Sequence, residues 1–262
     1  MPIGVRAGIA LLASALLTGL LAVGPAARGE PAPLNVFAAS SLTDIVNRLG
    51  EDFCVEQGGQ SGCIRGVFGA SSTLARQVAR GAPADIYLTA HEEWMDFLES
   101  RQQLAPGTRT VFAGNRLVVI QAASAPPAAD PIAALTRGRI ALADPDHVPA
   151  GRYAREALAS LGLWDTLAGR VVPTDNVRQA LLLVARGEVS TGVVYFSDAV
   201  ASARVAVVAV LPETLHSPIR YSAAAVRGGA DGAQAFLRFL SGPRAKAALA
   251  EQGFEPPQAP GD

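Results

Sequence analysis

The chain has 262 residues, of which 50% are hydrophobic and 17% are charged, and its formal net charge is −1. This hydrophobic share is enough for a sizeable core, so it excludes a largely disordered chain and fits one large domain or two smaller lobes. The near-neutral charge provides no basic surface, so we expect no nucleic-acid partner.

The N-terminal residues have the pattern of an export signal. Arg6 precedes an apolar run over residues 7–23, and small residues with Pro25 follow it. This pattern predicts a signal peptide over residues 1–32 and a periplasmic mature protein. A membrane anchor is the alternative, because the run approaches the roughly 17 residues that span a bilayer. The alanines and glycines within the run and the small residues after it favour cleavage.

From Leu34 onward, short apolar runs alternate with segments of helical periodicity. Such alternation is typical of an α/β fold with largely parallel sheets. The expected strands are 34–38, 64–68, 86–89, 117–121, 140–143, 171–173, 191–195 and 205–211. The expected helices are 42–57, 73–80, 92–101, 150–161, 177–185, 232–240 and 243–252.

Cys54 and Cys63 are the only cysteines, and a short polar loop separates them. In an oxidising compartment this pair favours a disulfide, which would contribute about 2 to 3 kcal/mol in the chain-entropy model. Two free thiols are the alternative. A metal site needs more ligands than this pair provides.

Four predicted strand-to-helix turns share hydroxyl or small residues at the start of the helix. The residues concerned are Ser41, the run Ser71, Ser72 and Thr73, the run Pro149, Ala150 and Gly151, and the pair Asn176 and Val177. Such turns open on the edge of a parallel sheet where ligands bind, and the unpaired N–H groups of a helix start attract anions. We interpret Ser41 and Asn176 as N-caps, and the serines as groups that accept a bond from their own helix while donating a proton to a ligand. Ordinary capping is the alternative for each turn taken alone.

The sequence lacks the common catalytic motifs. The sequence has no G-x-S-x-G pentapeptide, no HExxH pattern and no Gly-Lys-Ser/Thr phosphate loop. We therefore expect no enzyme, no cofactor and no metal-cation ligands, although a hydrolase that uses Ser71 is an alternative. Three arginines that follow the candidate turns are expected at solvated or cleft-rim positions: Arg76, Arg152 and Arg178.

Taken in order, these motifs closely resemble the periplasmic molybdate-binding proteins that serve ABC importers. The similar stretches run from about Asn35 to Phe254 and include "VFAASSLTDI", "SSTLARQVARGAPADIYLTA", "ADPDHVPAGRYAREAL", "VRQALLLVARGE" and "GVVYFSDAVAS". The resemblance implies a two-lobed type II periplasmic-binding-protein fold, with mixed, mostly parallel sheets flanked by helices and the ligand in the cleft. It implies a first lobe over 34–112 and 222–256 and a second lobe over 116–218.

The resemblance also implies the site and its ligand. The residues carried over by motif are the hydroxyl donors Ser41, Ser71 and Tyr195 and the backbone N–H donors Ala150 and Val177. The implied ligand is molybdate or tungstate, bound by hinge closure, and the implied partner is the membrane permease of an ABC importer. We also expect a monomer.

The donor-only site has a consequence for selectivity. It leaves the hydrogen of a protonated oxygen without an acceptor, so we expect hydrogen phosphate to be rejected, whereas sulfate must be excluded by size. A receptor for sulfate or another tetrahedral oxyanion is the alternative. Two residues depart from the family pattern: Ala70 replaces a serine of some relatives, and Phe196 stands where a small residue is common and would reshape the wall.

Overall fold

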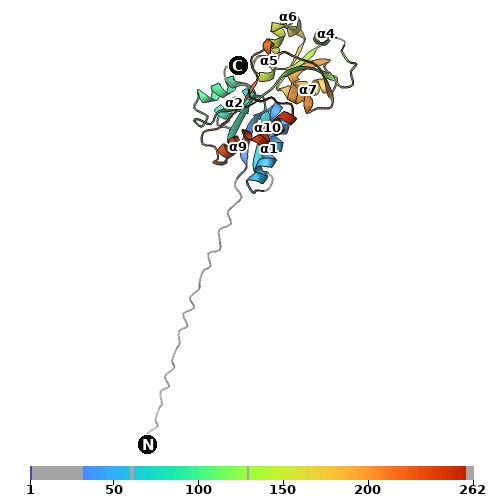
Figure 1. Cartoon of the computed structure of the whole chain (residues 1–262). Coiled ribbons are helices and arrows are strands. Elements are labelled where there is room, and N and C mark those ends of the chain that lie inside the picture. The colour runs from blue at the N-terminus through green and yellow to red at the C-terminus, as the bar shows by residue number, and fades with distance from the viewer. Residues whose placement is uncertain (2–31, 60–61, 129, 258–262) are drawn as a thin grey trace. The chain divides into compact units, whose positions relative to one another are not determined.

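The computed structural model describes residues 1, 32–59, 62–128 and 130–257. The predicted signal peptide falls almost wholly outside the described residues. Among the helices that the structure describes, none has the length and apolar character needed to cross a membrane. From Ala32 onward the described chain is built on two five-stranded sheets, each flanked by helices (Figure 1).

The first sheet has the strand order β2-β1-β3-β10-β4. Its strands are β1 (Leu34–Ala39), β2 (Ile64–Gly69), β3 (Ile86–Thr89), β4 (Thr110–Gly114) and β10 (Arg220–Ala225). β1 pairs in parallel with β2 and β3, whereas β10 runs antiparallel to β3 and β4. The helical segments around it are η1 (Ser40–Leu42), α1 (Thr43–Glu56), α2 (Ser71–Ala79), α3 (Glu92–Glu99), α9 (Gly232–Leu240) and α10 (Pro243–Glu251). We refer to this sheet and its helices as the first lobe.

The second sheet repeats this plan, with the order β7-β6-β8-β5-β9. Its strands are β5 (Leu117–Ala122), β6 (Ile140–Ala143), β7 (Val171–Thr174), β8 (Thr191–Tyr195) and β9 (Val205–Val210). β6 pairs in parallel with β7 and β8, and β5 runs antiparallel to β8 and β9. The helical segments of this second lobe are α4 (Pro131–Leu135), α5 (Pro149–Ser160), α6 (Trp164–Leu167), η2 (Ala168–Arg170), α7 (Val177–Ala185), α8 (Phe196–Val200) and η3 (Glu213–Leu215).

Helix α1 illustrates how the sequence builds these layers. Its buried residues recur at helical spacing at Ile45, Val46, Leu49 and Phe53, so one face of the helix is apolar. The ring of Phe53 meets that of Phe236 in α9 edge to face, with 5.2 Å between centroids. Burial of a large apolar side chain stabilises a fold by about 1.5 to 3 kcal/mol, so such contacts keep each helix on its sheet.

Every strand and helix expected from the sequence is present, with ends that differ by no more than two residues. The structure adds β4, β10, α4, α6 and α8 to the expected elements. β10 has the sequence RYSAAA, and alanine has a low preference for strands, so its pattern gives no strand signal. The chain crosses between the lobes after β4 and returns after β9. Each sheet is mixed and mostly parallel, as expected, because only β10 in the first sheet and β5 in the second run against the other strands.

Cys54 and Cys63 form a disulfide. The bond joins the last turns of α1 to the segment just before β2, and the described part of the chain contains no free cysteine. It therefore closes the loop that leads from the first helix into the sheet.

Candidate functional site

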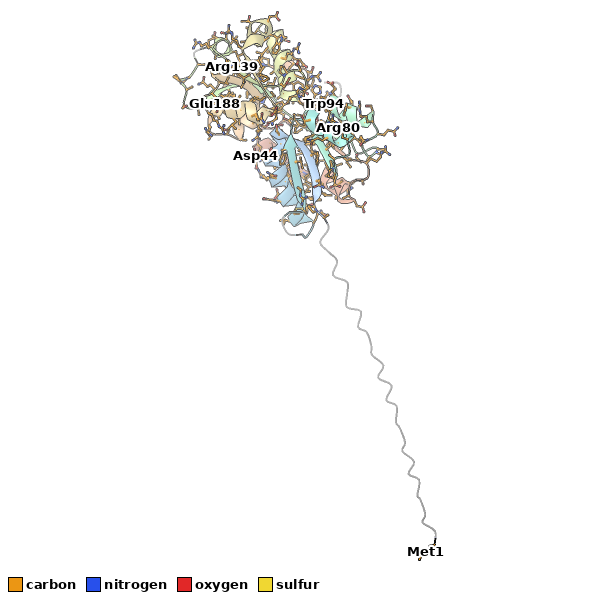
Figure 2. The ribbon with its side chains drawn as sticks, turned by 180° about the vertical axis from the view of Figure 1, so that it is seen from behind. Met1, Asp44, Arg80, Trp94, Arg139 and Glu188 are labelled. Atoms are coloured by element: carbon orange, nitrogen blue, oxygen red, sulfur yellow. A yellow bond between two sulfur atoms is a disulfide. The ribbon has the colours of Figure 1, made fainter. Side chains whose placement is uncertain are left out.

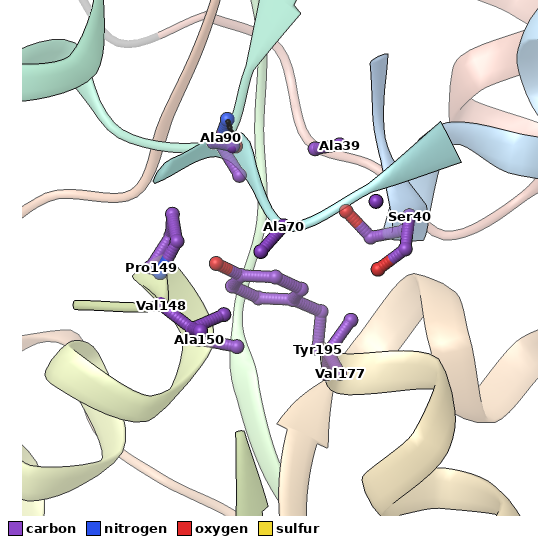
Figure 3. Close-up of a pocket in the computed structure, with 12 residues that line it drawn as sticks. Ala39, Ser40, Ala70, Ala90, Val148, Pro149, Ala150, Val177 and Tyr195 are labelled. Carbon is purple, nitrogen blue, oxygen red and sulfur yellow. Dashed lines mark hydrogen bonds between the residues drawn. The ribbon is translucent and has the colours of Figure 1, made fainter. Parts of the chain in front are cut away.

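A small pocket lies between the lobes, at the carboxyl ends of the strands. Its walls come from the residues after β1, β2 and β3 in the first lobe and after β6, β7 and β8 in the second. The lining residues are Ala39, Ser40, Ser41, Gly69, Ala70, Ser71, Ala90, Val148, Pro149, Ala150, Val177 and Tyr195. All five residues expected in the site are therefore brought together (Figure 3). The pocket volume is about 10 Å³, which is near the minimum for one water-sized group, so the pocket has no room for a sugar or peptide.

Ser41 reaches the pocket in a way the sequence did not predict. It lies inside the short 3-10 segment Ser40–Leu42, and α1 begins only at Thr43, so the expected N-cap role of Ser41 is wrong. Its Oγ instead lies 3.0 Å from the hydroxyl of Tyr221 in β10. A partner from a distant strand therefore replaces the expected bond to its own helix.

The hydroxyl of Ser71 also has its hydrogen-bond partner outside its own helix. It is the first residue of α2, two residues earlier than expected, and the helix has no side-chain cap. Its Oγ accepts a hydrogen bond from the backbone N–H of Ala90 at 3.1 Å, and its backbone carbonyl accepts one from the hydroxyl of Tyr87 at 2.9 Å. The neighbouring Ser72 is also buried but does not line the pocket.

The start of α5 brings backbone amides to the pocket. Pro149 is its first residue, and the first helical bond runs from the N–H of Arg152 to Val148, so the amides of Ala150 and Gly151 precede it. A Cβ atom on Gly151 would lie 2.0 Å from the carbonyl oxygen of Ala143 in β6. Only glycine therefore allows this helix start to approach the end of its strand.

The start of α7 has the cap that the sequence predicted. The side chain of Asn176 accepts bonds from the N–H groups of Arg178 and Gln179, at 3.0 and 3.2 Å. The preceding N–H, that of Val177, is outside this cap and belongs to a pocket-lining residue. It is thus placed to serve a ligand rather than its own helix.

Tyr195 is the most informative side chain of the pocket. It is only 1% exposed, and its hydroxyl has no hydrogen-bond partner among the described residues. In Figure 3 its ring lies across the pocket between Ala70 on one side and Ala150 and Val177 on the other. Burial raises the pKa of Tyr195 well above its ordinary value, so the hydroxyl keeps its proton and can donate it. Because this hydroxyl also lines the pocket, it is available to bind a ligand.

None of the described residues that line the pocket is charged. Arg178 stands next to it, with its guanidinium 2.8 Å from Asp44 of the first lobe and 2.6 Å from Asp198 of the second. Asp44 lies on the side of the first lobe near the second (Figure 2). Burial would lower the pKa of Arg178, but Asp198 and Asp44 raise it overall, and burial, opposed by Arg178, raises the pKa of Asp198 to about 6. The arginine charge is therefore balanced by carboxylates rather than aimed into the pocket.

The other expected positions have ordinary roles. Arg152 forms a second ion pair across the lobes, with Glu93, and Arg76 lies over the ring of Trp94, 5.3 Å from its centroid. Phe196 does not line the pocket, so the expected change of its wall is wrong, and its ring stacks instead under Arg116 at 4.3 Å. The departure at Ala70, by contrast, does lie on the pocket wall.

The sequence patterns did not identify the residues that connect to Ser41 by hydrogen bonds from outside the pocket. Asn115, in the crossover after β4, and Tyr221, in β10, form hydrogen bonds that end at Ser41. The stretch "GNRLVVI" around Asn115 belongs to the family resemblance, which was the available signal. No cluster of three or more His, Cys, Asp or Glu that could hold a metal ion occurs among the described residues. The arrangement is thus a set of neutral donors that can surround a small anion.

Comparison with known proteins agrees with this chemistry. A family model described as bacterial extracellular solute-binding protein matches residues 34–255. Among the curated relatives, the molybdate-binding protein ModA of Escherichia coli is 40% identical over 95% of this chain and 98% of its own length. The molybdate-binding protein ModA of Haemophilus influenzae is 39% identical over 85% of this chain and 90% of its own.

Solved structures lead to the same fold. The periplasmic molybdate-binding protein of Azotobacter vinelandii superposes with a TM-score of 0.78 at 25% identity, over 86% of this chain and all of that one. The sulfate-binding protein SubI of Mycobacterium tuberculosis has a TM-score of 0.70 at 18% identity, over 86% of this chain and 87% of that one, which is a likeness of fold. With two lobes, a pocket of uncharged residues between them and relatives matched over nearly their whole length, the chain belongs to the family of bacterial extracellular solute-binding proteins that includes the ModA proteins.

Proposed function

We propose that this protein captures molybdate outside the cytoplasm and delivers it to the membrane permease of an ABC importer. The observation that carries the proposal is the buried hydroxyl of Tyr195, which has no hydrogen-bond partner among the described residues and faces a pocket lined by Ser41, Ser71 and two helix starts. Hydroxyl and amide donors can replace the hydration shell of a dianion without a cationic side chain. The relatives that match over nearly their full length are named as molybdate-binding proteins.

The ligand set of the proposal is the hydroxyls of Ser41, Ser71 and Tyr195 and the backbone N–H groups of Ala150 and Val177. The first two belong to the first lobe and the other three to the second. An anion that contacts both groups stabilises the closed form, because it has more donors there than in an open form. The boundaries proposed for the lobes are 34–112 with 222–256 and 116–218.

Tungstate has nearly the same size and charge as molybdate, so the proposal includes tungstate binding. Signal-directed export, removal of residues 1–32 and a monomeric receptor complete it. The protein acts by binding and release, without a catalytic step. Sulfate is the rival ligand, because it has the same charge and shape as molybdate and a solved sulfate-binding protein shares the fold.

Calorimetric titration of the mature protein with molybdate, tungstate, sulfate and phosphate tests the proposal. We expect one-to-one binding of molybdate and tungstate, with sulfate and phosphate far weaker. Tight sulfate binding with weak molybdate binding would keep the site and overturn the ligand.

Three variants test the residues. Ser41→Ala and Ser71→Ala should each weaken molybdate binding by about 1 to 3 kcal/mol, or roughly 5- to 150-fold, because each removes a donor to a charged ligand. Ser72→Ala is the matched control, since Ser72 is adjacent and fully buried but does not line the pocket. Equal affinities in all three variants would remove Ser41 and Ser71 from the ligand set.

A further inference from the structure

Two side chains that do not line the pocket form a chain of hydrogen bonds to Ser41. The amide nitrogen of Asn115 lies 2.8 Å from the hydroxyl of Ser197 and 3.3 Å from the hydroxyl of Tyr221. The Tyr221 hydroxyl lies 3.0 Å from Oγ of Ser41. Asn115 is 3% exposed and Tyr221 is fully buried, so protein partners define this network.

The orientation of the Asn115 amide is determined by its oxygen. Oδ1 accepts hydrogen bonds from the backbone N–H groups of Arg116, at 2.9 Å, and Ser197, at 3.5 Å. A backbone N–H can only donate, so the group that faces these amides must be the oxygen. The nitrogen of Asn115 therefore faces Tyr221.

The direction of the remaining bonds follows by counting protons. An amide nitrogen only donates, so the oxygen of Tyr221 accepts from Asn115. Among the hydrogen bonds of the described residues, Oγ of Ser41 is the acceptor within reach of the Tyr221 proton, so we assign the proton of this bond to Tyr221. The proton of Ser41 is left free, and its oxygen belongs to a pocket-lining residue. Asn115 and Tyr221 thus make Ser41 a donor toward the pocket.

Ser71 reaches the same state by a separate route. The backbone N–H of Ala90 can only donate, so Oγ of Ser71 accepts at 3.1 Å and keeps its own proton free. Two hydroxyls that could in principle accept a proton from a ligand are therefore both arranged to donate one. At these two serines a protonated oxyanion therefore meets donors, and its hydrogen finds no acceptor there.

We propose that Asn115 and Tyr221 are positioning residues that hold the hydroxyl of Ser41 as a donor, and that this relay lets the site discriminate fully deprotonated oxyanions from protonated ones. The inference rests on the proposed oxyanion site. It assigns a role in selectivity to the crossover residue Asn115, which does not line the pocket.

The main test is Tyr221→Phe. The ring packs edge to face with Tyr195, Phe112 and Phe254 at centroid distances of 5.8, 6.3 and 5.4 Å, and phenylalanine keeps these contacts. Without the tyrosine proton, the Ser41 hydroxyl can turn and accept from a ligand. We expect the ratio of molybdate affinity to phosphate affinity to fall by about tenfold. A change of this size is within the range that the loss of one hydrogen bond causes. Phosphate is measured by competition against bound molybdate, and sulfate serves as the unprotonated reference.

Asn115→Asp provides a second, sharper test at mildly alkaline pH. An ionised carboxylate accepts from Tyr221, so the relay reverses and Ser41 presents a lone pair to the pocket. The added charge weakens binding of every dianion, but the reversed relay favours phosphate over sulfate relative to the wild type. Tyr87→Phe is the matched control, because it deletes an equally buried hydroxyl that donates to the backbone carbonyl of Ser71 and has no contact with the Asn115–Tyr221–Ser41 relay. Its ratios should equal those of the wild type.

The outcomes separate this inference from the proposed function. If the wild-type protein binds no oxyanion, the proposed function fails. If the wild type binds as expected but Tyr221→Phe and Asn115→Asp lower all affinities by the same factor, the two residues are structural and the relay is refuted. A change in the phosphate ratio in both variants, with none in Tyr87→Phe, supports the relay.

Discussion

Replacing Tyr195 by phenylalanine should leave the free protein at least as stable as the wild type but weaken its binding of ligand. The hydroxyl of Tyr195 is buried and contacts no described polar group, so its removal leaves no protein partner without a bond. The ring keeps its edge-to-face contact with Tyr221 at 5.8 Å. We therefore expect the free energy of unfolding without ligand to stay the same or to rise by up to about 1 kcal/mol, because a buried unsatisfied group is unfavourable.

The affinity for molybdate, by contrast, should fall. A hydrogen bond to a charged group contributes about 1.5 to 3 kcal/mol, so Tyr195→Phe should raise the Kd for molybdate by about 10- to 150-fold. The raised pKa of Tyr195 keeps the wild-type donor protonated in neutral solution, so the effect should not depend on pH near neutrality. Unfolding in urea without ligand and calorimetric titration with molybdate measure the two quantities.

Tyr87→Phe is the control for this experiment. Its hydroxyl is equally buried but donates to the carbonyl of Ser71 at 2.9 Å, so its loss should lower the free energy of unfolding by about 0.5 to 1.5 kcal/mol. The reasoning is refuted if Tyr195→Phe binds molybdate as tightly as the wild type, or if it loses stability as Tyr87→Phe does.

Three further variants have equally definite outcomes. Burial raises the pKa of Asp198 to about 6 from 3.8. The ionised carboxylate therefore destabilises the fold above pH 6, and this destabilisation is lost as the pH falls from 6 to below 3.8, the pKa of the group in the unfolded chain. Two pKa units correspond to about 3 kcal/mol, so acidification between these pH values should stabilise the wild type relative to Asp198→Asn in urea unfolding, and a pH-independent difference would contradict this. Gly151→Ala places a Cβ 2.0 Å from a β6 carbonyl oxygen and should lower stability by about 1 to 3 kcal/mol and weaken molybdate binding, whereas Gly169→Ala, with open space around it, should do neither. Replacing Cys54 and Cys63 by serine should lower the free energy of unfolding by about 2 to 3 kcal/mol, and equal unfolding midpoints with and without reductant in the wild type would contradict a stabilising disulfide.

Local pattern accounts for most of the expected elements. Apolar runs such as Leu34–Ala39 and periodic faces such as that of α1 are readable because burial requires one face, or the whole strand, to be apolar. The same logic fails for β10, whose alanines are buried by neighbouring strands and not marked by their own preference for strands.

In the candidate site, too, some features could be predicted from the sequence and others could not. Asn176 could be predicted as a cap, because an N-cap bonds only to residues two or three positions later. Ser41 could not be assigned its true partner, because Tyr221 lies 180 residues away along the chain and reaches Ser41 only when β10 has paired within the first sheet.

The sequence by itself determined most of the strands and helices, the cap of α7 by Asn176 and, through its motifs, the family to which the chain belongs. It did so because caps, apolar periodicity and motif order are properties of neighbouring residues. Only the tertiary structure decided that Ser41 pairs with Tyr221, that Ser71 accepts from Ala90, and that the Tyr195 hydroxyl has no described protein partner. Hydrogen bonds have a direction, and the direction depends on which donors from distant segments come within about 3 Å of each oxygen.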